Sequence, residues 1–167
     1  MRERVLIIDT SILCVWLNVR DFESCGPDDD RWDYSRVNQK ITEEINNGAK
    51  LVLPVATIIE TGNHITHARG DNYQACEKLV SVIEAAADEK SPWMDFSLQR
   101  DLWSPEKLKG LAYRWRDNRN CLSIGDVSIV DVADFYSHFG DVEILTGDSG
   151  LKSYEPQLTN SIPRRRK

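Results

Sequence analysis

Four acidic residues lie in well-separated segments, each close to a predicted strand end or helix start. Asp9 directly follows an unbroken apolar run, and Asp148 comes soon after another. Glu60 lies in a predicted helix after a third run, and Asp126 lies in the first turn of a further helix. Four carboxylates brought together repel one another strongly unless a cation lies among them. Because an all-oxygen donor set suits Mg²⁺ or Mn²⁺ rather than zinc, these acids predict a divalent metal site.

Each acid also has a local explanation. The segments 57–60 and 123–126 both have capping-box spacing, in which the acid serves the start of its own helix. Asp9 is placed to cap the helix that follows it, and Asp148 lies in a Gly-Asp-Ser-Gly stretch of turn composition. Taken singly, such acids are more often caps or turn residues than ligands. The occurrence of all four at the carboxyl side of the predicted strands favours the metal site.

The elements that would position these acids alternate along the chain. Unbroken apolar runs at 5–8, 51–53 and 142–145 are typical of buried parallel strands, and helical patterns lie between them. Ligands of an open parallel sheet gather at the carboxyl ends of its strands, where the acids are expected. The sequence therefore predicts an α/β fold, a three-layer sandwich with a central, mostly parallel twisted sheet.

Helices are predicted where apolar residues recur at a spacing of three or four. They cover residues 12–19, 37–45, 72–87 and 125–138, and two more begin near 56 and at Ser104-Pro105. In helix 72–87 the expected apolar stripe is Cys76, Leu79, Val80, Ile83 and Ala87. In the helix that Ser104-Pro105 opens, the expected stripe is Leu108, Leu111, Ala112 and Trp115.

Three further segments have weaker patterns. Residues 20–34 are polar, acidic and marked by Gly and Pro, which predicts a loop. Alternation at 93–98 predicts a short strand, and residues 161–162 predict a last one.

Length and composition predict one domain. The 167 residues, 41% of them hydrophobic, are expected to form a single domain over 1–163 with a basic tail at 164–167. The longest apolar runs are far shorter than the roughly 20 residues of a membrane span, and the N-terminus lacks a signal-peptide pattern. We therefore expect a cytoplasmic protein without a membrane segment. The scattered cysteines Cys14, Cys25, Cys76 and Cys121 lack zinc-ligand spacing and are expected to be buried thiols.

Four segments in order resemble the motifs of the PIN domain, a family of Mg²⁺- or Mn²⁺-dependent nucleases that includes bacterial ribonuclease toxins. They are 5–13 (VLIIDTSIL), 53–60 (LPVATIIE), 122–133 (LSIGDVSIVDVA) and 144–148 (ILTGD). The resemblance implies that Asp9, Glu60, Asp126 and Asp148 are the catalytic acids and bind one or two Mg²⁺ or Mn²⁺ ions.

The same resemblance implies supporting residues and partners. Ser11 and Thr146 match the hydroxyl positions that accompany the first and last acids. RNA is the implied substrate, and an antitoxin, another protein or a second copy of the chain is the implied partner. The loop at 20–34 and the helix at 72–87 look enlarged compared with the small toxin members.

Other polar residues near the acids leave two interpretations open. Asp131 lies on the helix of Asp126 but about 140° round it, so a solvated position is favoured over a ligand. Asn63 shares a helix face with Glu60. It is interpreted either as a substrate contact or as an ordinary surface amide. His64 and His67 form either a metal pair or, as we expect, two surface histidines, because no third soft ligand is evident.

Basic residues precede the Asp126 motif. Arg114, Arg116 and Arg119 surround Trp115 and are the best internal candidates for phosphate contacts. The alternative is a solvated helix end with Trp115 in the core. The predicted function is a metal-dependent ribonuclease, and the alternative is a catalytically silent PIN-like binding or scaffold module.

Charge and missing motifs limit the other possibilities. A haloacid-dehalogenase-type phosphatase needs a second acid where the chain has Ser11, and no glycine-rich Walker loop is present. The net charge of −6 disfavours a simple polyanion binder. The four candidate ligands account for most of that charge, so bound divalent ions would remove the objection.

Overall fold

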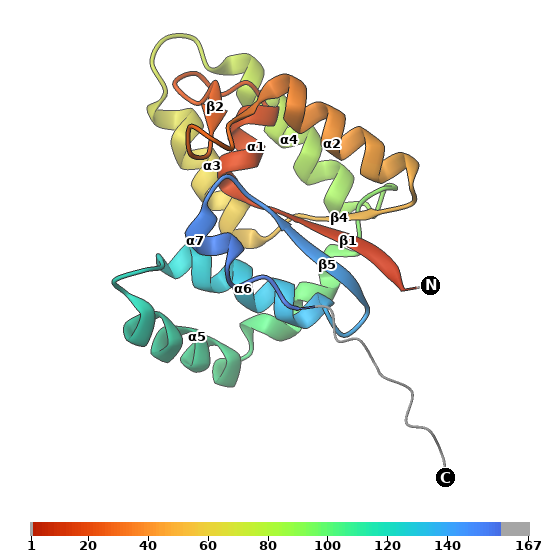
Figure 1. Ribbon diagram of the computed structural model, residues 1–167, viewed down its shortest axis with the longest axis vertical. Helices are drawn as coiled ribbons and strands as arrows, with labels where there is room; N and C mark the ends of the chain where they lie inside the picture. The colour runs from red at the N-terminus through yellow and green to blue at the C-terminus, as the bar shows by residue number, and fades with distance from the viewer. Residues whose placement is uncertain (1, 158–167) are drawn as a thin grey trace.

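Three parallel strands form a small central sheet, and the chain runs out of all of them at the same edge. The computed structural model describes residues 2–157. Its central sheet has the order β4-β1-β5, formed by β1 (Glu3–Ile8), β4 (Lys50–Val52) and β5 (Gly140–Leu145). Ile7 pairs with Val52 and Ile8 with Leu145, so the carboxyl ends of the strands lie together (Figure 1). The predicted α/β class with a parallel sheet is confirmed.

Helices cover both faces of the sheet. They are α1 (Thr10–Trp16), α2 (Tyr34–Asn46), α3 (Val55–His67), α4 (Tyr73–Ala87), the 3₁₀ helix η1 (Phe96–Trp103), α5 (Pro105–Asn118), α6 (Ile124–Tyr136) and α7 (Ser149–Lys152). Leu6 and Ile8 belong to the core beneath α1 and α2, whereas Val5 and Ile7 belong to a second core beneath α6 (Figure 1). Because both faces are buried, the central strand is a continuous apolar run rather than an alternating one.

The apolar stripe expected in α5 is largely exposed. Leu111 is buried and packs with Leu122 and Val127 in a small core between α5 and α6. Leu108 and Trp115 are 48% and 39% exposed. The reason is the position of α5 outside α6, which already covers the sheet, so that α5 packs mainly against α6 and η1. Of the expected stripe, Leu111 is buried, whereas Leu108 and Trp115 are exposed, and the alternative that placed Trp115 in the core is wrong.

The buried face of α4 also differs from the expected stripe. Ala75, Leu79 and Ala86 are buried, whereas Cys76 is exposed and Val80 is 44% exposed. The face of α4 that carries these three residues is the one that packs into the core, and α4 lies against α3. Cys121 is exposed as well, so the expectation of buried thiols holds for Cys14 and fails for these two.

Residues 93–98 do not add a strand. Trp93 forms a single bridge with Leu51, and η1 begins at Phe96. Gln99 explains the difference: its side chain is 2% exposed and its Nε2 donates to the carbonyl of Leu53 at 2.9 Å. This bond draws the segment across the end of β4 as a 3₁₀ helix.

The segment 20–34 is not a simple loop. β2 (Ser24–Cys25) and β3 (Trp32–Asp33) pair in an antiparallel hairpin, and Asp33 then caps α2. Gly26, with a φ of +89°, makes the turn that a side chain would strain. Each strand of this hairpin has only two paired residues. Strands of this length are too short to give a recognisable pattern in the sequence.

Two expectations concern the chain end. The strand at 161–162 and the basic tail at 164–167 lie outside the described residues. Within residues 2–157, none of the helices combines the length and apolar character needed to cross a bilayer.

An ion-pair network ties β1 and β5 to α2. Glu143 contacts Arg4, and also Lys40 at 3.1 Å and Lys152 at 3.4 Å. Glu44 pairs with the same Arg4 at 3.2 Å and Lys40 at 2.6 Å. Burial by itself raises the pKa of Glu44, but the hydrogen bonds and charges of Arg4 and Lys40 outweigh it and hold that pKa below its usual range. The network therefore stabilises the fold when Glu44 is ionised.

Glu44→Gln is expected to destabilise the fold in a pH-dependent manner. Because the pKa of Glu44 is lower in the folded protein than in the unfolded one, its contribution is present at neutral pH and is lost as the pH falls below about 4.5. The free energy of unfolding, measured by urea denaturation, should fall by about 1 to 2 kcal/mol at pH 7, and the deficit should shrink in acid. Glu84→Gln, at an exposed position of α4, is the control and should change little. A deficit that is the same at every pH would contradict this role of Glu44.

Candidate active site

Asp9 lies at the carboxyl end of the central strand and is held by two hydroxyl groups. Its Oδ2 accepts hydrogen bonds from Ser11 Oγ at 2.6 Å and Thr146 Oγ1 at 2.7 Å, while its amide donates to the carbonyl of Leu145 at 3.1 Å. The residue is only 5% exposed. Burial raises the pKa of Asp9 above its ordinary value, and the hydrogen bonds from Ser11 and Thr146 counteract only part of that rise. The side chain is therefore fixed in a position where its charge is poorly solvated.

Glu60 projects from α3 toward the same strand end. Its Oε2 accepts from Thr10 Oγ1 at 2.9 Å. Burial, together with the charges of Asp126 and Asp9, raises the pKa of Glu60, against the lowering effect of the hydrogen bond from Thr10. Three carboxylates are thus close enough for their charges to act on one another.

The capping explanation for Glu60 is wrong. The cap position of α3 is Pro54, which makes no side-chain hydrogen bond, and Thr57 instead donates Oγ1 to the carbonyl of Ile8 at 2.9 Å. That buried bond ties α3 to the end of β1. Glu60 consequently has no role at its own helix start, and its bond to Thr10 directs it toward the other acids.

A glycine allows this approach. Gly125, in the first turn of α6, is buried, and a Cβ atom on it would overlap the carboxylate of Glu60. The carboxylate therefore lies against the start of the helix that carries Asp126. With any side chain at position 125, the Glu60 carboxylate would have to move from this place.

Asp126 and Asp148 each use one carboxylate oxygen to accept hydrogen bonds from backbone amides at the start of their own helices. Asp126 forms a capping box with Ser123, accepting from the Ser123 amide through Oδ2 at 2.8 Å. Asp148 caps α7 through Oδ1, which accepts from the amides of Gly150 at 2.7 Å and Leu151 at 3.2 Å. The capping explanation therefore applies to both residues, but it uses only one oxygen of each carboxylate.

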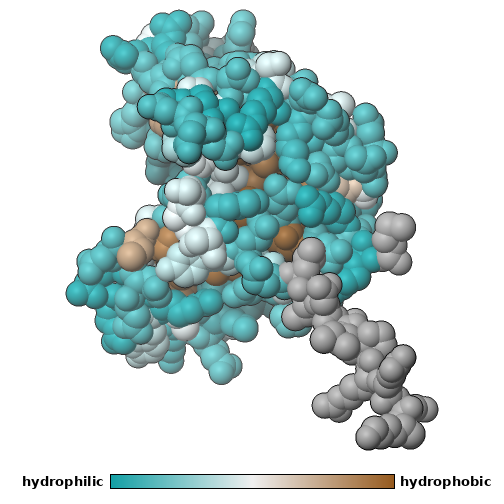
Figure 2. All heavy atoms as spheres, viewed as in Figure 1, coloured by the Kyte–Doolittle hydropathy of each residue, from teal (hydrophilic) through white to brown (hydrophobic). Residues whose placement is uncertain are grey.

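All four predicted acids line one pocket of about 290 Å³, which we call the acid pocket. Thr10, Ser11, Cys14, Phe22, Cys25 and His64 complete its lining. It lies where α3, α6 and α7 approach one another, and Figure 2 shows a largely hydrophilic face that is hollowed between the part formed by α1 and α3 and the part formed by α5. The tertiary structure thus brings together residues from four separate segments.

The acid pocket is not a preassembled metal cluster. Among residues 2–157, no group of three or more His, Cys, Asp or Glu side chains has the arrangement to hold a metal ion as it stands. The donor set nevertheless fits a hard divalent cation, because it consists of carboxylate and hydroxyl oxygens. Burial is the main cause of the raised pKa values of Asp9 and Glu60, so the ionised form of each carboxyl group is poorly solvated here.

The supporting residues predicted from the sequence fall into two groups. Ser11 lines the acid pocket, and its Oγ also accepts from the amide of Gly147 at 3.0 Å. Thr146 does not line the pocket but donates to Asp9. Asn63 is exposed and does not line the pocket. Asp131 is neither a lining residue nor solvated, because its side chain is 13% exposed and forms an ion pair with Arg114.

The basic stretch lies away from the acids. Arg114 pairs with Asp131 and with Asp134 at 3.7 Å, and Arg116 pairs with its neighbour Asp117 at 2.9 Å. Arg119 donates to the carbonyl of Arg116 at 2.8 Å. These three arginines lie at the end of α5, and none of them lines the acid pocket.

Sequence reasoning missed five residues of the acid pocket, Thr10, Cys14, Phe22, Cys25 and His64. His64 is a lining residue whose ring lies 4.5 Å from that of Phe22, whereas His67 is exposed and bonds to the carbonyl of Asn63. The two histidines therefore do not form a metal pair. The spacing of four from Glu60 could have placed His64 on the same helix face, but nothing in the sequence signals Phe22, Cys25 or Thr10.

Gly125→Ala is expected to show an unfavourable coupling with Glu60. At Gly110, an exposed position of α5 with open space around it, alanine should stabilise the fold by about 0.5 to 1 kcal/mol through helix propensity. At Gly125 the same change should lack this gain, because the new Cβ displaces the Glu60 carboxylate. In a Glu60→Ala background the gain should return, as measured by a double-mutant cycle in urea denaturation. Additive effects of the two changes would contradict the close approach.

Comparisons of the chain with protein-family models, with curated proteins and with solved structures found no match. The resemblance to PIN domains therefore stays a prediction from the four sequence segments.

Proposed function

We propose that the protein is a PIN-like nuclease that uses Mg²⁺ or Mn²⁺ to hydrolyse phosphodiester bonds, with RNA as its substrate. One observation carries this proposal: Asp9, Glu60, Asp126 and Asp148 line a single pocket at the carboxyl end of the sheet. Glu60 in particular has no local structural task and reaches the pocket because Gly125 makes room for it. Structural capping alone does not account for that convergence.

The proposed chemistry follows from the donor set. Divalent ions, when bound, acidify water for attack and neutralise charge on the phosphate oxygens. Asp9 is the proposed central ligand, because Ser11 and Thr146 hold its carboxylate at the strand end. Glu60, Asp126 and Asp148 would contribute further oxygens from α3, α6 and the start of α7. Thr10 orients Glu60 and thereby positions it toward the pocket.

A catalytically silent binding module is the second candidate. The observation that favours it is the local use of Asp126 and Asp148 as caps, together with the lack of a preassembled ligand cluster among the described residues. In that case Asp126 and Asp148 would serve stability, and their replacement by alanine would weaken the helix starts by about 1 kcal/mol without changing any activity.

Cleavage should require both the metal and the acids. Asp9→Asn and Asp126→Asn are expected to lower the rate of RNA cleavage in Mg²⁺ or Mn²⁺ by at least about 100-fold, because each removes a charged ligand. Asp101→Asn, on the exposed surface of η1, is the matched control and should retain full activity. The measurement is the cleavage of labelled single-stranded RNA with and without chelator. Equal activity of all variants, or no cleavage by the wild type, would favour the binding module.

Metal binding should also be visible in stability. A cation bound at 100 times its dissociation constant contributes about 2.7 kcal/mol, so Mn²⁺ is expected to raise the Tm of the wild type measurably. Glu60→Gln should be at least as stable as the wild type in metal-free buffer, since the raised pKa shows that its charge is unfavourable there. The same variant should show a smaller shift with Mn²⁺. A variant that is less stable without metal, yet gains the full shift, would contradict this assignment.

A further inference from the structure

The hairpin segment at residues 22–32, here called the arm, is packed tightly against the end of β5. At Gly147 a Cβ atom would lie 2.6 Å from Cys25 Sγ and 2.8 Å from the amide of Gly26, so only glycine permits this contact. Phe22 also packs against the core that contains α1. The arm is therefore held in place beside the acids. The proposed hydrolysis does not use any of its residues.

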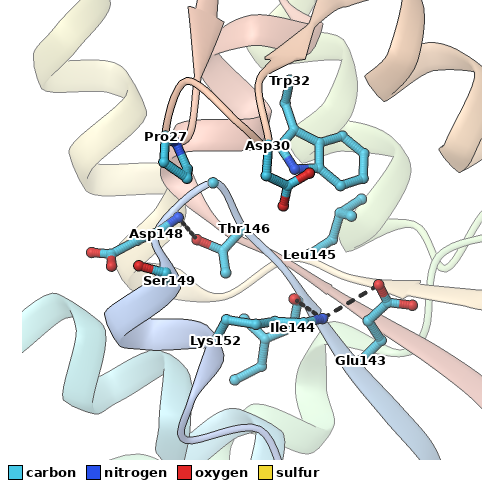
Figure 3. Close-up of a pocket in the computed structure, with 11 residues that line it drawn as sticks. Pro27, Asp30, Trp32, Glu143, Ile144, Leu145, Thr146, Asp148, Ser149 and Lys152 are labelled. Carbon is cyan, nitrogen blue, oxygen red and sulfur yellow. Dashed lines mark hydrogen bonds and ion pairs between the residues drawn. The ribbon is translucent and has the colours of Figure 1, made fainter.

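The arm borders two pockets that share Asp148. On one side it contributes Phe22 and Cys25 to the acid pocket. On the other side Pro27, Asp30 and Trp32 form the roof of a second pocket of about 190 Å³, here called the Trp32 pocket, whose floor is the end of β5 and α7. Figure 3 shows Trp32 and Asp30 above Leu145, whereas the Asp148 side chain points to the left, away from Trp32. A ligand crossing Asp148 from the acid pocket would enter the Trp32 pocket next.

The side chains of the Trp32 pocket are held in position. The guanidinium of Arg36 lies 3.8 Å from the Trp32 ring centroid and pairs with Asp30 at 2.7 Å. Lys152 Nζ donates to the carbonyl of Ile144 at 3.0 Å and pairs with Glu155 at 2.7 Å. The charges of Lys152 and Asp30 are thus both paired within the protein. The pocket offers an aromatic ring, apolar carbon and the second carboxylate oxygen of Asp30, whose Oδ1 is the atom that pairs with Arg36.

This composition selects one kind of ligand. An anion is disfavoured by Asp30 and Asp148, and the volume lies below the roughly 300 Å³ at which pockets for drug-sized ligands begin. A planar, neutral heterocycle with N–H groups fits the ring and the carboxylate. Nucleobases have this chemistry, and their stacking on aromatic side chains is the usual way in which proteins bind single strands.

We propose that the arm is a base-binding element and that the Trp32 pocket holds a nucleobase next to the phosphate bound at the acid pocket. The inference rests on the proposed nuclease function for the location of that phosphate. Base stacking requires an unpaired base, so the arm selects single strands over duplexes. Trp32 is in this view a substrate-binding residue, separate from the acids.

The test compares two replacements of Trp32 in the full chain carrying Asp9→Asn, which blocks the proposed cleavage. Trp32→Phe keeps an aromatic ring, whereas Trp32→Leu keeps apolar volume without one. Binding of a fluorescein-labelled 12-nucleotide RNA in Mg²⁺ is followed by anisotropy. We expect Trp32→Leu to bind about 5- to 100-fold more weakly and Trp32→Phe to stay within about threefold of the parent. Trp103→Ala, at an exposed position of η1, is the control and should bind as the parent does.

The outcomes separate the inference from the proposed function. An oligonucleotide of abasic spacers should bind weakly and equally to the Leu and Phe variants, and the duplex should bind more weakly than the single strand. Equal RNA binding by the Leu and Phe variants, or a preference for the duplex, would overturn the base-binding role of the arm. If the wild type cleaves nothing while binding still depends on an aromatic residue at 32, the nuclease proposal fails and the inference stands. If neither the wild type nor the Asp9→Asn chain binds any nucleic acid, both fail.

Discussion

The carboxylate of Asp9 is the interaction on which the arrangement of the site depends. It is buried at the end of the central strand, and the hydroxyls of Ser11 and Thr146 reach it from α1 and from the segment after β5. The Thr146 hydroxyl in turn accepts from the amide of Asp148 at 2.9 Å. One charged group therefore sets the positions of two strand ends and of a second acid. An isolated carboxylate at this depth would be too costly without these donors.

The site carries charge at a cost to the fold. Burial raises the pKa values of Asp9 and Glu60, and the charges of Asp126 and Asp9 raise that of Glu60 further, whereas hydrogen bonds and cations lower the pKa of Glu44 in the network across the sheet. The same residue type thus stabilises the protein in one place and opposes folding in another. Strain of this kind collects at functional sites, where stability is exchanged for reactivity or binding. The direction of the pKa shift therefore distinguishes the carboxyl groups of the acid pocket, where it is raised, from Glu44 in the structural ion pairs, where it is lowered.

Much of the fold could be predicted because the signals are local. The apolar runs of β1, β4 and β5 are continuous since both faces of the sheet are covered, and the caps at Ser104 and Ser123 mark helix starts directly. The errors occur where packing rather than periodicity decides. Helix α5 lies outside α6, so its stripe is exposed, and Gln99 turns an alternating segment into a 3₁₀ helix. Two-residue strands such as β2 and β3 are too short to leave a pattern.

The sequence by itself determined the identity of the four acids and the side of the sheet on which they gather, because parallel strands must all end at one edge. Only the tertiary structure decided what surrounds them. It placed Glu60 against Gly125, paired Arg114 with Asp131 away from the site, and brought Phe22, His64 and Trp32 beside the acids. These contacts join residues far apart in the chain through the close packing of helices and a hairpin. No spacing along the sequence encodes such contacts.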